Sequence, residues 1–570
     1  MRNAEVAIIF YQIADFLDLE GVAFKPNAYR KAARSIESLS EDVVEVRKQG
    51  KLREISGVGE AIEKKIEEIL DTGQLAYLNE LKEQYPAGLL QVMSVPDVGP
   101  KTAVRLYKEL KVTSVQDLKK AALEHRIRGL KGFGERSEEG ILHGIELLER
   151  RSGRMLLGYA YPAAEAIVEY LRKKANTEKV SVAGSLRRMK ETIGDIDILL
   201  GTDEPRWAMD IFTSHPDVSE VVVKGETKVT VRLQGGVQVD IRVVKEAEYG
   251  AALQYFTGSK DHNISLRQMA IDKGLKLNEY GLFRKESGEV VAREKEEDIY
   301  AALGLEIMPP EIRENNGEIE ASLNHKLPKL VELKDIKGDF HVHTNASDGN
   351  ATMEEIAYAC KRRGYEYVGI ADHSEGLKVA NGLSVERLRG NIDIAKNLSR
   401  LLPEVRVLVG TEVEIEDDGK LGYPNSTLKD LDFVLGSVHS RFNMSEKEMT
   451  ERVLTAISNE HFTILGHPTG RVLEQREPYA IDLDRVMRAA KDNGVCLELN
   501  AFPERLDLKD THCRKAKEIG TTIAIGTDSH AVTHLDNMLY GVATGRRGWL
   551  EPADVLNTRP LKALEKLLAK

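Results

Sequence analysis

The fold of the middle of this chain is decided by the stretch Gly184-Ser185-Leu186-Arg187-Arg188-Met189-Lys190-Glu191-Thr192-Ile193-Gly194-Asp195-Ile196-Asp197-Ile198-Leu199-Leu200. It predicts a Gly-Ser turn that opens a short basic helix, followed by a buried strand that carries Asp195 and Asp197. Side chains two apart on a strand point to the same face, so these two carboxylates lie about 7 Å apart along the chain. Because like charges repel at that spacing, the pair indicates a site for divalent cations.

A second strand-like run supplies a third acid, Asp240, within residues 236–244. Three carboxylates around two hard cations form the arrangement that in-line phosphoryl or nucleotidyl transfer requires. The Gly184-Ser185 turn offers backbone N–H groups to a phosphate, and Arg188 adds a charged fork. An Asp-x-Asp pair by itself is a weak signal, so the prediction depends on the turn and on the third acid.

The next segment resembles the family X DNA polymerases through Tyr255-Phe256-Thr257-Gly258-Ser259, Asn263, Arg267 and Leu277-Asn278-Glu279-Tyr280-Gly281-Leu282. The resemblance implies an α+β nucleotidyltransferase palm at 151–253 and a thumb at 254–317. It implies two Mg²⁺ ions held by Asp195, Asp197 and Asp240, and contacts of Arg267 with DNA. The nucleotide contacts that it implies are Gly184, Ser185, Arg188, Gly194, Tyr255, Phe256, Gly258 and Asn263.

Length and composition predict a multidomain globular protein. A chain of 570 residues holds three to five domains, and 42% hydrophobic with 30% charged residues is ordinary for soluble proteins. No apolar run approaches ~18 residues, and three widely spaced cysteines favour a reducing compartment. We therefore expect a cytoplasmic protein without a membrane partner. The net charge of −11 leaves nucleic-acid binding undecided.

The N-terminal part is predicted to be all-α and to bind DNA. Residues 55–66 look like a helix-hairpin-helix, and residues 95–103 look like a second copy. In such a motif a glycine turn lets the backbone approach a phosphate at a helix N-terminus. The predicted domains are 1–85, a lyase-like domain, and 86–150, the fingers. The predicted DNA contacts here are Gly57, Gly59, Gly99 and Lys101.

The first hairpin also resembles the small N-terminal domain of family X repair polymerases. The resemblance implies that Lys25 and Tyr29 bind a 5′-phosphate and that Lys65 stands at the Schiff-base position of a lyase. Phe24 and Ala61 depart from the lyase-active relatives, so the resemblance leaves the lyase activity of Lys65 open.

A polar, proline-containing linker is predicted at 318–335, and residues 336–570 have a different chemistry. Seven short apolar runs alternate with helical segments, and ligand-type residues follow most of the runs. This is the layout of a β/α barrel, whose functional groups lie at the C-terminal ends of its strands. Nine such nitrogen and oxygen ligands suit two or three Mn²⁺ or Zn²⁺ ions. They are His341, His343, Asp348, His373, Glu412, His439, His467, Asp528 and His530.

The motifs His-Val-His, Ala-Asp-His-Ser, Gly-Thr-Glu, Val-His-Ser, Gly-His-Pro and Asp-Ser-His follow one another in this half and resemble the PHP (polymerase and histidinol phosphatase) domain. The resemblance implies a distorted (β/α)7 barrel. A family X core followed by this barrel resembles the bacterial and archaeal family X polymerases. That implies Mn²⁺-dependent 3′–5′ exonuclease or 3′-end processing, with AP endonuclease activity in some members.

The combined prediction is a monomeric DNA polymerase that fills short gaps in base excision repair. Its partners are gapped or primer–template DNA and deoxynucleoside triphosphates. Two alternatives stay open for the histidine-rich half, which is either a small-molecule phosphatase or an inactive structural or DNA-binding module.

Overall fold

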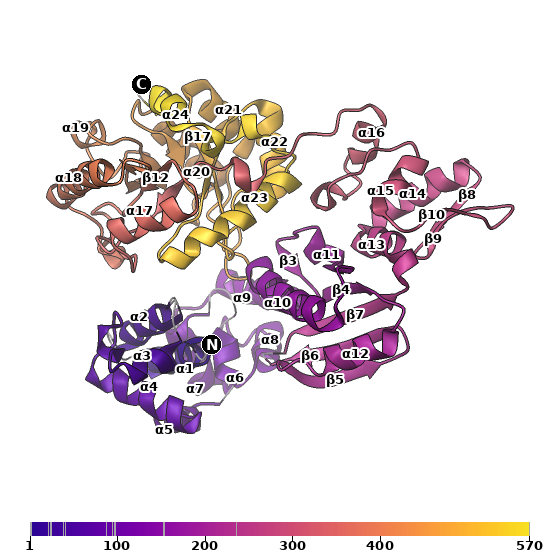
Figure 1. The fold of residues 1–570 in the computed structure, drawn as a ribbon. Helices are drawn as coiled ribbons and strands as arrows, with labels where there is room; N and C mark the ends of the chain where they lie inside the picture. Colours follow the sequence, from indigo (N-terminus) through magenta and orange to yellow (C-terminus); the bar gives the residue numbers. More distant parts are fainter. Residues whose placement is uncertain are drawn as a thin grey trace.

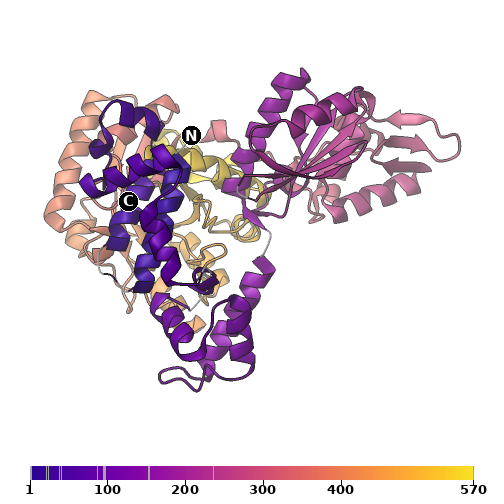
Figure 2. The same ribbon diagram turned by 90° about the horizontal axis from the view of Figure 1, so that it is seen from below.

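The chain folds into a helical N-terminal part, a sheet-containing middle and an α/β C-terminal part (Figure 1). The computed structural model describes residues 3–20, 22, 25–37, 39, 42–86, 88–93, 95, 98–151, 154–234 and 236–568. Viewed from below in Figure 2, the N-terminal helices overlap the C-terminal part, and the middle of the chain extends away from both. The aspartate-bearing strands and the histidine-bearing strands therefore lie in separate parts of the molecule.

Short helices build the N-terminal part and share one hydrophobic core. Its buried residues run from Val6 to Ile145, so the first and last helices pack into one unit. The helices are α1 (Asn3–Glu20), α2 (Lys25–Glu37), α3 (Val43–Lys48), α4 (Glu60–Thr72), α5 (Ala76–Gln84), α6 (Gly88–Met93), α7 (Pro100–Leu110), α8 (Val115–Leu123) and α9 (Glu135–Arg151).

Both predicted hairpins place a glycine at the N-terminus of their second helix. Gly59 precedes α4 and Gly99 precedes α7, and no described atom would contact a Cβ added to either. Those helix N-termini are therefore open to a phosphate. Gly57 has a φ of +82° and packs against α2, so this turn requires glycine. Lys101 is exposed on α7, and residues 94, 96 and 97 lie outside the described residues.

A mixed five-stranded sheet forms the first half of the middle part, in the order β2-β4-β7-β6-β5. Strands β4 and β7 are parallel neighbours, and the other pairs are antiparallel. Helices α10 and α12 pack against each other and against this sheet. The elements are β1 (Met155–Leu156), α10 (Leu157–Ala175), β2 (Val180–Val182), α11 (Gly184–Arg187), β3 (Thr192–Ile193), β4 (Ile196–Gly201), α12 (Pro205–Thr213), β5 (Val218–Lys224), β6 (Lys228–Leu233) and β7 (Gln238–Val244).

The second half of the middle part combines helices with the small antiparallel sheet β10-β9-β8. Its elements are α13 (Tyr249–Thr257), α14 (Lys260–Asp272), β8 (Leu275–Asn278), β9 (Gly281–Arg284), β10 (Val290–Ala292), α15 (Glu296–Ala302) and α16 (Glu318–Leu323). Helix α16 lies in the segment predicted as a linker. Its Glu318 is fully buried and bonds Nδ1 of His262 at 2.6 Å, so the start of that segment is packed against α14.

Parallel strands alternate with helices in the C-terminal part. Backbone hydrogen bonds join β11-β12-β13 in one sheet and β14-β15-β16-β17-β18 in another. Isolated bridges connect the sheets at both ends, through His373 with Glu412 and through Val342 with Ser529. The strands are β11 (Gly338–Val342), β12 (Tyr367–Ile370), β13 (Arg406–Val409), β14 (Glu412–Glu414), β15 (Leu435–Ser437), β16 (Ile464–Leu465), β17 (Cys496–Asn500) and β18 (Ile523–Gly526).

The helices of the C-terminal part follow the strands along the chain. They are α17 (Met353–Arg362), α18 (Val385–Leu401), α19 (Asn425–Leu428), α20 (Glu446–Ile457), α21 (Leu483–Asn493), α22 (Asp510–Ile519), α23 (Met538–Arg547) and α24 (Leu561–Leu568). Among the described residues, no helix has both the length and the apolar composition needed to cross a membrane.

The C-terminal part packs directly on the mixed sheet of the middle part. Leu506, Tyr540 and Ala543 belong to the same buried cluster as the core of that sheet. Arg471 makes an ion pair with Glu191 at 2.8 Å across this boundary. The two parts therefore share apolar and ionic contacts.

Two candidate active sites

The structure brings the three predicted aspartates together on the mixed sheet. Asp197 in β4 is paired in register with Asp240 in β7, and Asp195 immediately precedes β4. Carboxylate oxygens of all three lie within 4.8 Å of one another. Asp195 is exposed, Asp197 is half-buried and Asp240 is buried. This group, called the aspartate site below, has the oxygen ligands and spacing that hard divalent cations take.

The charges of the aspartate site are not balanced by the protein. Burial raises the pKa of Asp197 to about 7, and the charges of Asp195 and Asp240 add to the rise, although Arg242 and Lys228 oppose it. Oδ1 of Asp240 is buried and accepts no hydrogen bond from the described chain. Lys228 on β6 makes an ion pair with Oδ2 of Asp240 at 2.5 Å. The three carboxylates outnumber these two cations, so the remaining negative charge fits metal ions.

The Gly184 turn lies directly against the acid-bearing strand. The Ala183 amide donates to the carbonyl of Asp197 at 2.8 Å. Gly184 has a φ of +57°, and a Cβ at this position would collide with the Oδ2 carboxylate oxygen of Asp197. Only glycine combines this conformation with so close an approach. Ser185 is half-buried in the same turn.

A buried ion network joins the turn to the helices that follow the sheet. Arg187 contacts both carboxylate oxygens of Glu296, at 2.9 and 2.6 Å, and Arg313 bonds the same carboxylate at 2.6 Å. Burial opposes ionisation of Glu296, but Arg313 and Arg187 hold its pKa at about 2. Bidentate contacts of this kind fix geometry as well as contributing energy. The network therefore sets the position of α11 relative to α15.

Arg188, the predicted phosphate contact, is engaged by protein groups in this structure. Its Nε donates to Glu314 at 3.0 Å, and its Nη1 donates to the Thr257 carbonyl at 2.6 Å. The side chain is 12% exposed. Gly258, with a φ of +71°, lies close to the same guanidinium, and an added Cβ there would be 3.2 Å from Nη1.

The predicted nucleotide-contacting segment forms the end of α13 and one face of α14. The rings of Tyr255 and Phe256 are half-buried and meet edge to face at 5.1 Å. Asn263 is 8% exposed, and its amide donates to the Tyr255 carbonyl at 2.7 Å. Arg267 is half-buried, and its Nε donates to the Asn263 carbonyl at 3.2 Å. Asn263 thus braces the Tyr255 backbone.

The predicted lyase residues lie on two N-terminal helices. Lys25 is exposed on α2, whereas Tyr29 is 9% exposed and packs against α1 by its ring edge. Burial raises the pKa of Tyr29 to about 12. Lys65 on α4 is half-buried, with Nζ 5.0 Å from the centre of the Tyr77 ring. Phe24 lies outside the described residues.

The nine predicted ligands of the C-terminal part converge at the C-terminal ends of its strands. Because parallel strands end at one edge, groups far apart in sequence meet there. Glu412 lies within 3.0 to 3.6 Å of five histidines. Three overlapping groups of possible ligands result, which are His343, Asp348, His373 and His530; His341, His343 and Asp528; and His373, Glu412 and His439. These residues and His467 are called the histidine site below.

The surroundings of His343 indicate whether the histidine site has the ligand chemistry that metal ions need. Both of its ring nitrogens are buried and make no hydrogen bond with any described residue. Nε2 lies 3.3 Å from Asp528 and 3.6 Å from Glu412, and the rings of His373 and His530 are 4.5 and 4.4 Å away. Burial and the neighbouring imidazoles lower the pKa of His343 to about 4. A neutral imidazole with open nitrogens among carboxylates is the form that ligates divalent ions.

A second layer of carboxylates, absent from the predictions made on the sequence, orients the histidines. Glu498 in β17 is 1% exposed, contacts Nδ1 of His341 at 2.6 Å and accepts the backbone N–H of His467 at 2.6 Å. Glu414 in β14 contacts Nδ1 of His439 at 2.8 Å. Such partners fix the ring orientation and basicity of a ligand. The available signal was an acid inside the apolar run Cys-Leu-Glu-Leu-Asn.

Arg505 is a further residue at the histidine site without a sequence signal. Its Nε lies 3.4 Å from Oδ2 of Asp528. Its Nη1 is buried and has no hydrogen-bond partner within the described ranges. A guanidinium that has an unpaired N–H group beside candidate metal ligands is suited to bind an anionic oxygen.

Comparison with protein families assigns most of these regions. Residues 1–75 match a helix-hairpin-helix domain, and residues 89–146 match a tandem of helix-hairpin-helix type. Residues 252–314 match the DNA polymerase beta thumb, and residues 339–502 match the PHP domain. The matched helical, thumb and PHP regions agree with the fold class expected from the sequence.

Individual relatives resemble either the whole chain or one half. DNA polymerase lambda of Rattus norvegicus is 27% identical over 53% of this chain and 54% of its own length. A probable phosphatase of Thermoanaerobacter sp. (strain X514) is 31% identical over 41% of this chain and 94% of its own length. The DNA polymerase/3′-5′ exonuclease PolX of Bacillus subtilis (strain 168) is 39% identical over 100% of both chains. A likeness of that extent shows the family, and the chain belongs to the family X DNA polymerases with a C-terminal PHP domain.

Proposed function

We propose that this protein is a gap-filling DNA repair polymerase with a 3′–5′ exonuclease in its C-terminal part. The observation that carries the proposal is the presence of two separate ligand clusters in one chain. One is the aspartate site behind the Gly184 turn, and the other is the histidine site at the strand ends. The Bacillus subtilis relative, a DNA polymerase/3′-5′ exonuclease, pairs the same two activities. We place the protein in the cytoplasm as a monomer.

The matched families and the strand order support a division into domains. We assign 1–85 to a lyase-like domain, 86–150 to fingers, 151–253 to the palm, 254–317 to the thumb, 318–335 to a linker and 336–570 to the PHP domain. We infer a distorted (β/α)7 barrel for the last, since bridges connect its two sheets at both ends. Strands β13 and β14 then count as one interrupted strand.

In the palm, Asp195, Asp197 and Asp240 would hold two Mg²⁺ ions. When bound, such ions lower the pKa of the primer hydroxyl and neutralise the triphosphate. The Gly184-Ser185 backbone and Arg188 contact the phosphates, with Gly194 in the same loop. Tyr255, Phe256, Gly258 and Asn263 line the nucleotide sugar and base, and Arg267 contacts the template.

DNA is held by backbone contacts outside the palm. The open N-termini after Gly59 and Gly99 receive phosphates, with Gly57 and Lys101 beside them. Lys25 and Tyr29 bind the 5′-phosphate of a gap. Lys65 is the lyase candidate; the residue is half-buried, and its amine lies 5.0 Å from the centre of the Tyr77 ring. Borohydride trapping on an abasic substrate, lost in K65A, would test that role.

In the PHP domain the nine residues of the histidine site would hold two or three Mn²⁺ or Zn²⁺ ions. When bound, such ions activate water and bind a scissile phosphate. Glu498 and Glu414 keep the histidines in a ligating orientation. Arg505 is placed to contact a phosphate oxygen of the DNA 3′ end. AP endonuclease activity is a second use of the same site.

The two sites are tested by paired substitutions. D195A/D197A should lower primer extension on gapped DNA by on the order of 10³-fold while leaving 3′–5′ degradation unchanged. H341A/H343A should do the reverse. Both variants and wild type are assayed on the same gapped substrate with Mg²⁺ or Mn²⁺. An intact activity in the variant assigned to it would refute that assignment.

A small-molecule phosphatase is the second candidate for the PHP domain, since the domain resembles probable phosphatases over nearly their whole length. Hydrolysis of a phosphomonoester without degradation of a DNA 3′ end would favour it. If H341A/H343A changed neither phosphomonoester hydrolysis nor degradation of a DNA 3′ end, the PHP domain would be an inactive module.

A further inference from the structure

Helix α23 of the PHP domain brings Arg547 to the Gly184 turn of the palm. Its Nη1 donates to the main-chain carbonyl of Arg188 at 2.7 Å and to Oε1 of Glu314 at 3.0 Å. Its Nε donates to Asp510 of its own domain at 2.9 Å. The Arg547 side chain is 5% exposed. Nη1 also donates to the Glu311 carbonyl at 3.3 Å, so a guanidinium anchored in the PHP domain contacts three groups of the polymerase part.

Glu314 gathers positive charge from both domains. Its Oε1 accepts from Arg188 and Arg547 at 3.0 Å each, and Lys190 lies 3.8 Å away. Burial opposes ionisation, but Arg188, Arg547 and Lys190 together lower the pKa of Glu314. The three cations Arg188, Lys190 and Arg547 face two carboxylates, those of Glu314 and Asp510, so one positive charge of this group is not neutralised. Positive charge is left for an anionic ligand.

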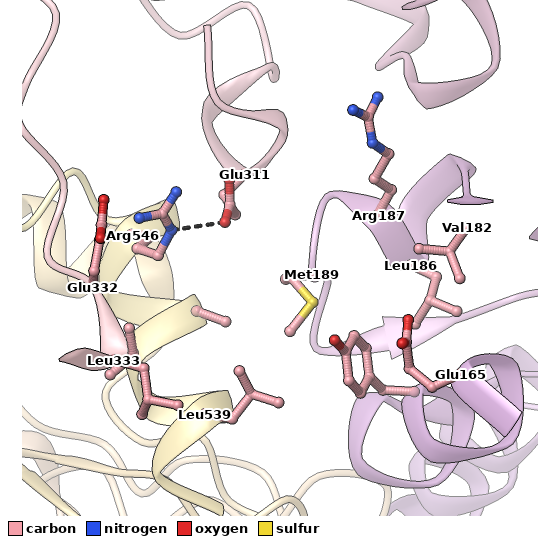
Figure 3. A pocket seen from close by; sticks show the side chains of 13 residues that line it. Glu165, Val182, Leu186, Arg187, Met189, Glu311, Glu332, Leu333, Leu539 and Arg546 are labelled. Carbon is pink, nitrogen blue, oxygen red and sulfur yellow. Dashed lines mark hydrogen bonds and ion pairs between the residues drawn. The ribbon is translucent and has the colours of Figure 1, made fainter. Parts of the chain in front are cut away.

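Apolar contacts also join this turn to α23, because Leu186 and Met189 belong to the same buried cluster as Tyr540 and Ala543. An open cleft of about 320 Å³ lies between the palm and α23, and Figure 3 shows the Met189 side chain between its two walls. Other residues that line it are Leu186, Leu539 and Val542. Arg547 adds directional contacts to this apolar packing, through the Arg188 carbonyl and Glu314.

We propose that Arg547 is a positioning residue for nucleotide addition. Through the Arg188 carbonyl and Glu314, it holds the Arg188 guanidinium where the triphosphate of the incoming nucleotide binds. The nuclease domain would thus complete the polymerase site of the same chain. This inference rests on the proposed role of Arg188 as a triphosphate contact.

The test compares R547A with R546A on the full-length protein. Arg546 is the matched control, because it precedes Arg547 on α23 and pairs with Glu311 at 2.7 Å across the same boundary (Figure 3). No hydrogen bond joins Arg546 to Arg188 or Glu314 among the described residues. R547A should raise KM for deoxynucleoside triphosphate roughly tenfold with a smaller change in kcat. R546A should leave both near the wild-type values.

Three further measurements separate positioning from general damage. The 3′–5′ nuclease activity of R547A should stay within about twofold of wild type, since the histidine site is intact. R547K, which keeps the charge but not the fork, should give an intermediate KM. If R547A proves unstable, R547K carries the test by itself: a raised KM with normal nuclease activity supports the proposal. A wild-type KM in R547K would then overturn it.

R188A distinguishes failure of the inference from failure of the proposed function. A raised KM in R188A together with a normal KM in R547A leaves Arg188 as a phosphate contact and refutes the role of Arg547. An unchanged KM in R188A refutes the phosphate contact, and the inference with it. E314Q combined with R547A should raise KM by less than the product of the single effects, because both act on Arg188.

Discussion

The aspartate site and the histidine site differ in how their charges are balanced before any cation arrives. In the aspartate site, Asp195 is exposed, and Lys228 makes an ion pair with only one of the three acids, Asp240. Burial and mutual repulsion raise the pKa of Asp197 to about 7. In the second, histidines surround the buried Glu412 and outweigh the effect of burial, so the pKa of that carboxyl is well below its ordinary value.

Under the proposed function, the aspartate site would be completed by its substrate, whereas the side chains of the histidine site already contact one another. The open sheet holds three acids close together, and under the proposed function cations and a triphosphate would remove the repulsion. At the strand ends of the PHP domain, acids and imidazoles contact one another. Glu498 and Glu414 contact Nδ1 of His341 and of His439 and so fix the orientation of these rings. The predictions below test whether this contrast governs stability and catalysis.

Removal of divalent cations should produce the largest difference between the two sites in the stability of the surrounding strands. If the histidine site binds ions in the folded state only, ions at about 1,000 times their Kd stabilise the PHP domain by about 4 kcal/mol. Chelation should therefore increase hydrogen exchange in β11 to β18 and leave β4 to β7 nearly unchanged. Equal changes in both sheets would contradict the contrast.

The ion network beside the aspartate site should depend on pH and not on metal. The pKa of Glu296 is about 2 in the folded chain against 4.5 ordinarily, which corresponds to about 3 kcal/mol. Because the folded-state pKa is the lower one, this stabilisation is present above about pH 4.5 and is lost as the pH falls towards 2. E296Q should thus be less stable than wild type at pH 7, and the gap should shrink at pH 3.5.

Urea unfolding of both proteins at the two pH values measures this gap. E297Q, which changes the exposed neighbour on α15, is the control and should track wild type. A gap that stays constant with pH would show that Glu296 acts by packing rather than charge.

A methyl group on the Gly184 turn should damage synthesis alone. In G184A the Cβ would collide with Asp197, and displacing a catalytic group by about 1 Å lowers kcat by on the order of 10²-fold. G274A is the matched control, since Gly274 also has a positive φ, +71°, but no described atom would contact its Cβ. Primer extension and degradation rates are measured for both. Similar losses in the two variants would mean that backbone strain, not the collision, is responsible.

Weakening the second layer of the histidine site should have the smallest effect. E498Q removes the charge that orients His341, and nuclease activity or metal affinity should fall roughly 10-fold to 100-fold. E354Q, at an exposed position of α17, should change neither. A nuclease rate in E498Q equal to wild type would show that the histidines need no such support.

Most residues of both sites could be predicted from local sequence pattern. The spacing of Asp195 and Asp197 on a strand places both on one face, and the structure groups them with Asp240. The nine ligands of the histidine site follow strand ends, where a parallel arrangement gathers them. Each of these predictions needs only the period of a strand and the direction of its end.

The sequence did not specify the distant residues that contact the side chains of the two sites. Glu498 reaches His341, 157 residues before it, and Arg547 reaches Arg188 across 359 positions. Neither has a motif of its own.

The sequence by itself determined which candidate ligands are present and which face or strand end they occupy, because side-chain direction follows from local backbone geometry. Only the tertiary structure decided which buried charge meets which, and that Arg188 is tied to Glu314 rather than open to solvent. The physical reason is that such contacts join residues far apart in the chain, within one part or between two, and depend on how many distant residues pack at once.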